Sequence, residues 1–293
     1  MFRQLLAIDA GNSRLKFGLF TPSQTSFYRR IHGTIARIVD VPGDWPHCRR
    51  FLAIPAGDPI PWLTLIGWQP EGVVIAGSNP QGIDQVLENW PGSELPSPLV
   101  VRDHQSISVQ VDVDAPDKVG LDRLLSAVAA NAIRPASRPA IVIDSGTATT
   151  VNFISQEGVF CGGAILPGLE MSAKALDHYT AALPLVPVQD LGGEPPVAPG
   201  RNTRDAIRNG LFWGQIGAIR ELVGQICRRQ QLREPDFYGN GDPTDSPWLV
   251  LTGGGGPVLR SQLPGLLFVR SLGMHGLVLT AWHQGSVSQC QPR

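Results

Sequence analysis

The sequence contains the stretch Ile141-Val-Ile-Asp-Ser-Gly-Thr-Ala-Thr-Thr150, an apolar run that ends in Asp-x-Gly and continues into strand-forming residues. The same pattern occurs near the start of the chain as Ile8-Asp-Ala-Gly-Asn-Ser13. It predicts a buried strand that enters a tight turn, because glycine adopts backbone angles that other residues avoid. Amides beside small hydroxyl or amide side chains can bind an anion, and an aspartate there can hold a hydrated magnesium ion. The two copies therefore indicate two related halves that bind the phosphates of a nucleotide.

The first turn is followed by Arg14-Leu-Lys-Phe-Gly-Leu-Phe20, which alternates and so predicts a second strand. A Rossmann fingerprint requires a helix at this point, and the P-loop pattern G-x-x-x-x-G-K-S/T does not occur in the sequence. A phosphate-binding hairpin of this kind resembles that of the actin, Hsp70 and sugar kinase superfamily. For each copy taken alone, a plain hairpin turn without a ligand is the alternative.

The composition limits the class of protein. A chain of 293 residues is long enough for two domains. Its net charge of −1, with 17% charged residues, gives no basic excess that would attract nucleic acid or an anionic membrane. No apolar run approaches the length of a membrane span, and Asp9 interrupts the first apolar stretch, which disfavours a signal peptide. We expect a cytoplasmic protein that binds neither nucleic acid nor membranes.

The domain boundary is expected near Pro116, which gives an N-terminal domain over residues 1–114 and a C-terminal domain over residues 115–293. The first domain is predicted to begin with a hairpin over residues 1–20, followed by an irregular segment over residues 21–60. In the second, the pattern predicts a helix from Val119 to Ile133, the second hairpin, a long amphipathic helix or pair of helices from Thr203 to Gln231 and a buried strand from Trp248 to Thr252.

A further candidate site is the stretch Gly120-Leu-Asp-Arg123, which opens a predicted helix. Phosphoryl transfer needs an acceptor hydroxyl that is oriented and deprotonated, and the carboxylate of Asp122 can do both. Arg123 can bind a substrate carboxylate. The alternative is structural, because the helix dipole alone favours an acidic residue in a first turn. Lys16 can likewise reach a phosphate or be an ordinary exposed strand lysine.

In their order along the chain, these segments resemble the type III pantothenate kinases, a family that includes the Bvg accessory factor proteins. The segments span nearly the whole chain, and the ordered set is more specific than any one of them. They are Asp9-Ala-Gly-Asn-Ser-Arg-Leu-Lys16, Gly120-Leu-Asp-Arg123, Asp144-Ser-Gly-Thr-Ala-Thr-Thr150, Gly162-Gly-Ala-Ile-Leu-Pro-Gly168, Gly200-Arg-Asn-Thr203 and Leu251-Thr-Gly-Gly254.

The resemblance implies a two-domain α/β fold of the actin, Hsp70 and sugar kinase type, with ribonuclease H-like mixed sheets flanked by helices. It implies ATP-dependent phosphorylation of pantothenate to 4′-phosphopantothenate, the first step toward coenzyme A. It also implies a homodimer, with a helical dimerisation region at about residues 169–231. The implied cofactors are ATP, Mg²⁺ and a monovalent cation, K⁺ or NH₄⁺.

The same resemblance assigns roles to individual residues. Asp122 is the implied catalytic base. Asp144 is the implied ligand of the monovalent cation, and Asp9 lies near Mg²⁺ through water. The implied ATP-binding residues are Asp9, Gly11, Asn12, Ser13, Lys16 and Thr147, and the implied pantothenate-binding residues are Gly120, Leu121, Asp122, Arg123 and Thr203.

One departure from the family pattern concerns the substrate. Val113 stands seven positions before Gly120, where the family usually has a tyrosine that contacts pantothenate. This keeps open a kinase that acts on another small hydroxylated substrate. A non-catalytic binding or regulatory protein of the same fold is the third hypothesis, which the presence of Asp9, Asp122 and Asp144 disfavours.

Overall fold

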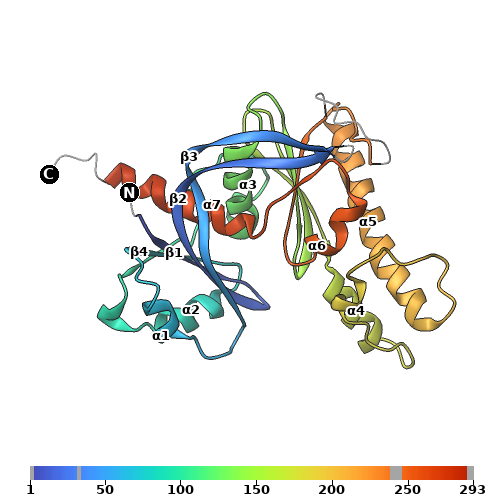
Figure 1. The fold of residues 1–293 in the computed structure, drawn as a ribbon, viewed down its shortest axis with the longest axis horizontal. Coiled ribbons are helices and arrows are strands. Elements are labelled where there is room, and N and C mark those ends of the chain that lie inside the picture. Colours follow the sequence, from blue (N-terminus) through green and yellow to red (C-terminus); the bar gives the residue numbers. More distant parts are fainter. Residues whose placement is uncertain (1–2, 32–33, 238–245, 289–293) are drawn as a thin grey trace. The chain divides into compact units, whose positions relative to one another are not determined.

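The computed structural model describes residues 3–31, 34–237 and 246–288, and it contains two five-stranded mixed sheets (Figure 1). The strand orders are β3-β2-β1-β4-β5 and, read from the other edge, β8-β7-β6-β9-β10. The strands of the first sheet are β1 (Leu5–Ala10), β2 (Arg14–Ile31), β3 (Thr34–Pro55), β4 (Gly72–Ala76) and β5 (Pro98–Val100). Those of the second are β6 (Ala140–Ser145), β7 (Ala148–Ile154), β8 (Phe160–Pro167), β9 (Trp248–Thr252) and β10 (Leu267–Phe268).

The two sheets repeat one topology. In each, the first strand pairs antiparallel with the second and parallel with the fourth. Helices follow at corresponding points of the two repeats. They are α1 (Trp62–Ile66), α2 (Pro80–Glu88) and α3 (Leu121–Ile133) in the first repeat, and α4 (Leu169–His178), α5 (Thr203–Arg229), α6 (Gly256–Leu259) and α7 (Leu272–Ser288) in the second. The expected α/β class with two mixed sheets is confirmed.

The first compact unit comprises Met1–Arg29, Ile35–Ile133 and Leu272–Arg293. Side chains alternate across β1, so that Leu6 and Ile8 face one way and Asp9 the other. Leu6 and Ile8 belong to a buried cluster that also contains residues of α1 and α2. The opposite face packs against α7, which also contacts β4. Asp9 therefore lies on the face of the sheet that a helix covers.

The helices α3 and α7 pack closely against each other and lie side by side in Figure 1. A β-carbon at Gly276 would lie 1.8 Å from the backbone oxygen of Leu125. Only glycine lets the two backbones approach this closely. The position of α3 therefore depends on α7.

The second compact unit contains residues 134–271, with the short segment Arg30–Thr34. The 27-residue helix α5 is anchored at its start by Asn202, whose side chain accepts a hydrogen bond from the amide of Asp205. Its inner face buries Leu211, Ile216 and Val223 in a core with residues of β6, β7 and α4. This core fixes the turn between β6 and β7.

The compact units differ from the expected domains. The first unit extends through Ile133 rather than ending at residue 114, and it includes α7. The physical reason is the packing of α3 on α7, which periodicity within α3 does not reveal. The expectation of an irregular segment over residues 21–60 was wrong, since β2 continues to Ile31 and β3 covers Thr34–Pro55. The pairing of β2 with β3 in the sheet, and not local propensity, decides that segment.

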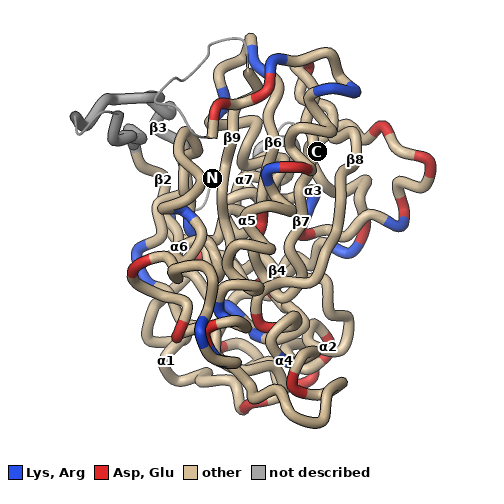
Figure 2. Tube along the Cα trace, turned by 90° about the vertical axis from the view of Figure 1, so that its right-hand side faces the viewer, with Lys and Arg blue, Asp and Glu red and all other residues tan. Residues whose placement is uncertain are grey.

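Charged residues of both signs are interspersed along the chain (Figure 2). Among the helices that the structure describes, none is both long and apolar enough to cross a membrane.

Candidate active site

The first turn joins β1 to β2 and carries the first predicted aspartate. The register places Asp9 opposite Lys16, and Lys16 Nζ lies 2.8 Å from Asp9 Oδ2. The turn is closed by a 3.0 Å hydrogen bond from the amide of Gly11 to the oxygen of Arg14. Asn12 and Ser13 at its tip are exposed. The turn thus presents polar side chains and backbone to solvent, with a lysine and a carboxylate at its base.

The second carboxylate of this unit is Asp122, in the first turn of α3. The amide of Arg123 donates a 2.9 Å hydrogen bond to Asp122 Oδ1. A β-carbon at Gly120 would lie 2.6 Å from that same oxygen, so glycine leaves the room that the carboxylate occupies. The Asp122 carboxylate is therefore folded back onto the backbone at the start of α3.

Burial raises the pKa of the Asp122 carboxyl above its ordinary value. The hydrogen bond from Arg123 opposes this, the negative charge of Asp9 raises the pKa further, and the cations of Arg123 and Lys16 lower it. The pKa of Arg123 is itself lowered by burial, which the charge of Asp122 opposes. The structure thus brings four predicted residues into one electrostatic group within the first unit. A partly buried carboxylate with a raised pKa beside cations is suited to accept a proton from a bound hydroxyl.

The second turn joins β6 to β7 in the other unit. Its register places Asp144 opposite Thr150, and the amide of Gly146 bonds the oxygen of Ala148 at 3.1 Å. Thr147 at the tip is exposed. The amide of Gly168 donates a 3.1 Å hydrogen bond to the oxygen of Thr147, which ties the end of β8 to this turn.

Gly253 lies beside Asp144 and has a φ of +88°, in the region that favours glycine. A β-carbon there would lie 2.4 Å from both Asp144 Oδ1 and the backbone oxygen of Ser145. Glycine therefore allows the backbone of Gly253 to pass close to a carboxylate oxygen and a carbonyl oxygen, which lie near each other at the second turn. Such hard oxygen ligands suit a monovalent cation, so the residues present fit the implied ion.

Asp9 also fits its implied ion. Mg²⁺ is usually held by one or two carboxylates, with water and substrate phosphates completing its shell. Within residues 3–31, 34–237 and 246–288, no three His, Cys, Asp or Glu side chains form a group that could hold a metal alone. A single carboxylate at the base of an exposed turn is the arrangement expected for a magnesium ion that arrives with a nucleotide.

Thr203 is exposed at the start of α5, directly after the capping residue Asn202. Thr203, Asp144 and Thr147 all belong to the second unit, whereas the group around Asp122 belongs to the first. Gly120 and Leu121 lie with Asp122 at the start of α3. The roles of these residues stay predictions.

Sequence reasoning missed two glycines that position the first-unit group. Gly276 lets α7 touch α3, as described above. Gly77 follows β4, where a β-carbon would lie 2.1 Å from the oxygen of Ala10 beside the first turn. The available signal was a glycine inside a helical pattern and a glycine at a strand end, both of which indicate a close backbone approach.

A family model described as type III pantothenate kinase matches residues 5–225, three quarters of the chain. The chain belongs to the type III pantothenate kinase family. A type III pantothenate kinase of Alkalilimnicola ehrlichii is 34% identical over 284 residues, which cover 96% of this chain and 98% of that protein. One from Paramagnetospirillum magneticum is 34% identical over 226 residues, covering 76% of this chain and 80% of that protein.

Solved structures agree on the fold. A Baf family protein of Campylobacter jejuni, described as a transcriptional activator, superposes with a TM-score of 0.55 at 15% identity, covering 96% of this chain and 99% of its own. The activator of the 2-hydroxyisocaproyl-CoA dehydratase of Clostridium difficile, solved with bound ADPNP, has a TM-score of 0.50 at 13% identity, with 99% and 98% coverage. At these identities the likeness concerns the fold alone, which is the actin, Hsp70 and sugar kinase type.

The family match includes Asp9, Asp122, Asp144 and Thr203, and it ends before Gly253. Val113, where the family usually has tyrosine, lies within the match and is partly buried. At Val113 the chain therefore departs from the usual family residue within a segment that the family model matches.

Proposed function

We propose that this chain phosphorylates pantothenate to 4′-phosphopantothenate with ATP, the first step of coenzyme A biosynthesis. The observation that carries the proposal is Asp122. It is a partly buried carboxylate with a raised pKa, held at the start of α3 and electrostatically coupled to Asp9 and Lys16 at a phosphate-type turn. Membership of the family supplies the reaction class and the substrate.

In this mechanism Asp122 accepts the proton of the primary hydroxyl of pantothenate as the hydroxyl oxygen attacks the terminal phosphorus of ATP. The bond from that phosphorus to the bridging oxygen breaks, and ADP leaves. Arg123 binds the pantothenate carboxylate, since a guanidinium pairs well with a carboxylate. Lys16 and the amides of the first turn bind the phosphates. Asp9 would hold Mg²⁺ through water, and the ion would supply positive charge to the phosphate oxygens.

The proposed cation site and the proposed homodimer are each supported by one structural feature. The proximity of the Asp144 carboxylate oxygen and the Ser145 carbonyl oxygen near Gly253 supports a K⁺ or NH₄⁺ site. A homodimer through residues 169–231 is supported by the exposed apolar side chains of Met171, Tyr179 and Leu185 in that region. A cytoplasmic location stays a prediction from the sequence.

A kinase for another small hydroxylated substrate is the second candidate, and the observation that favours it is Val113. A valine cannot donate the hydrogen bond that a tyrosine would. A non-catalytic binding protein is disfavoured, because binding alone does not require a partly buried carboxylate with a raised pKa.

The test is a coupled assay of ADP release with pantothenate and with a panel of hydroxy acids and sugars, in potassium and magnesium. We expect pantothenate to give the highest kcat/KM. Folded, ATP-binding protein that releases no ADP with pantothenate would disprove the proposal. Faster turnover of another panel member would favour the second candidate.

A further inference from the structure

We propose that Asn209 and Trp213 of α5 position Thr203 for the substrate by holding the loop that precedes α5 along the helix. The inference deepens the proposed function and rests on it, because Thr203 is an implied pantothenate-binding residue. The loop connects the short 3₁₀ helix Val188–Leu191 to Asn202, the capping residue of α5, and lies wholly within the second unit.

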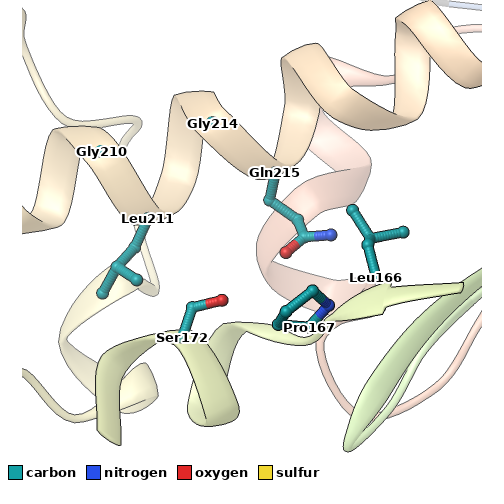
Figure 3. A pocket seen from close by; sticks show the side chains of 7 residues that line it. All are labelled: Leu166, Pro167, Ser172, Gly210, Leu211, Gly214 and Gln215. Atoms are coloured by element: carbon teal, nitrogen blue, oxygen red, sulfur yellow. The ribbon is translucent and has the colours of Figure 1, made fainter. Parts of the chain in front are cut away.

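The helix α5 presents different faces to its neighbours. Figure 3 shows Leu211 and Gln215 directed toward the segment where β8 passes into α4. An α-helix turns by about 100° per residue, so Asn209 and Trp213, which are four residues apart, share another face. This second face carries the contacts to the loop.

Two side-chain hydrogen bonds tie this face to the loop. Trp213 Nε1 donates a 2.9 Å hydrogen bond to the oxygen of Pro196, and Asn209 Nδ2 donates a 3.0 Å hydrogen bond to the oxygen of Val197. Asn209 Nδ2 also donates a 2.9 Å hydrogen bond to the oxygen of Asp205, one turn earlier on α5. Because both of its partners are carbonyl oxygens, only the nitrogen of the Asn209 amide can face them. The orientation of this side chain is therefore fixed.

The loop runs back along α5 toward the start of the helix. After the bond to Asn209 comes a close contact at Gly200, where a β-carbon would lie 2.4 Å from the amide nitrogen of Ala206. Only glycine permits this approach of two backbones. The contacts on α5 therefore move from Trp213 through Asn209 to Ala206, about one turn of helix at a time, and the chain then enters the helix at Asn202.

Thr203 lies where this loop becomes helix. Asn202 Nδ2 donates a 2.8 Å hydrogen bond to Asp205 Oδ2, and Asn202 Oδ1 accepts a 2.9 Å hydrogen bond from the amide of Asp205. This cap fixes the helix side of Thr203, and the contacts of Asn209 and Trp213 fix the loop side. The exposed Thr203 is thus held in place before a ligand arrives. A group that is held in advance loses less conformational entropy on binding.

The first measurement is amide hydrogen exchange by mass spectrometry on the full-length protein without substrate. Asn209→Leu and Trp213→Phe each remove one donor to the loop, and the second keeps an aromatic ring. We expect exchange in residues 196–203 to be several-fold faster in both variants, because local opening of the loop loses part of its free-energy cost. Gln225→Leu is the control, since it removes an amide that bonds Glu221 on the same helix.

Kinetics separate positioning from a purely structural role. KM for pantothenate should rise roughly two- to tenfold in Asn209→Leu and in Trp213→Phe, the value of one neutral hydrogen bond. Both kcat and KM for ATP should change little, because a lost binding contact raises KM without lowering kcat. In a Thr203→Val background, Asn209→Leu should no longer raise KM for pantothenate, since the loop acts through the Thr203 hydroxyl.

Unchanged hydrogen exchange in both variants, or faster exchange with an unchanged KM for pantothenate, would overturn the inference. An equal rise of KM in the Thr203→Val background would overturn it as well, because the loop would then affect the substrate by another route. Failure of the proposed function is seen separately, as wild-type protein that releases no ADP with pantothenate. The exchange experiment needs no substrate and still decides whether Asn209 and Trp213 hold the loop.

Discussion

The β1–β2 turn and the β6–β7 turn are held by similar backbone hydrogen bonds but carry different side chains. In the first half, the amide of Asn79 bonds the oxygen of Ala10 at the end of β1. In the second, the amide of Gly255 bonds the oxygen of Ser145 at the end of β6. The side chain opposite the aspartate differs, because Lys16 faces Asp9 whereas Thr150 faces Asp144. The turn itself also differs, with Gly11 to Arg14 between the last paired residues in the first and Gly146 to Ala148 in the second.

The helices that end the two repeats, α3 and α7, also differ in the charge of their first turns. The first turn of α3 carries Asp122, whereas the first turn of α7 carries no acidic residue. The two halves thus share one topology but carry different side chains. The first half carries Asp9, Asp122 and Lys16, and the second carries Asp144 opposite Thr150. Under the proposed function, the first half would bind phosphate and magnesium and take up the proton, and the second half would bind the monovalent cation.

The largest effect should come from Asp122→Asn, which removes from α3 the feature that α7 lacks. Loss of a positioned base typically lowers turnover by about a hundred- to ten-thousand-fold. Steady-state ADP release at saturating ATP and pantothenate measures this, with circular dichroism to verify the fold. Turnover within threefold of wild type would remove Asp122 from the role of base.

Lys16→Thr makes the first turn resemble the second at the position opposite the aspartate. Hydrogen bonds to charged groups contribute about 1.5–3 kcal/mol, so kcat/KM for ATP should fall roughly ten- to a hundredfold. Lys174→Thr is the matched control, since Lys174 forms an exposed ion pair with Glu170 on α4. Similar losses in both variants would contradict a specific role for Lys16.

Gly253→Ala tests the second turn. A β-carbon there would lie 2.4 Å from Asp144 Oδ1, so the carboxylate would have to move, and activation by K⁺ or NH₄⁺ relative to Na⁺ should disappear. Gly254→Ala is the control, because a β-carbon at Gly254 meets nothing within 4 Å. Initial rates in the three chloride salts measure the effect. Equal rates of wild type in all three would argue against the cation site.

The raised pKa of Asp122 also predicts a pH effect on stability. A carboxyl whose folded pKa lies above its unfolded value binds its proton more tightly when folded, so its contribution favours folding at low pH. That contribution is lost as the pH rises from about 4, the usual pKa of aspartate, through the raised value. Asp122→Asn should therefore increase the free energy of unfolding at pH 7 more than at pH 3, as measured by urea denaturation at both values. A variant less stable than wild type at pH 7 would contradict this.

The smallest effect concerns Val113→Tyr, which restores the residue usual in the family. One neutral hydrogen bond contributes about 0.5–1.5 kcal/mol, so KM for pantothenate should fall a few-fold to about tenfold, with KM for ATP nearly unchanged. Val109→Tyr, in the same connecting segment, serves as the control. No gain with pantothenate would favour a different hydroxylated substrate.

The sequence predicted what depends on local pattern. The hairpins at Asp9 and Asp144 and the buried strand Trp248–Thr252 follow from apolar runs and turn residues, and the structure has them. The group around Asp122 was predicted through an ordered set of motifs. The sequence did not reveal the length of β3 or the return of α7 to the first unit. Both depend on partners distant in the chain, which local propensity does not encode.

The return of α7 bears on how the protein is made. Residues up to Ile133 leave the ribosome first, but α3 has its packing partner only when Leu272 to Ser288 has been synthesised. Until then the apolar face of α3 stays uncovered, and the start of the helix that carries Asp122 is not held in place. The last helix to be translated therefore completes the first half of the molecule, and a chain cut short after Ser271 would lack a properly positioned Asp122 although it retains every residue to which we assign a catalytic or binding role.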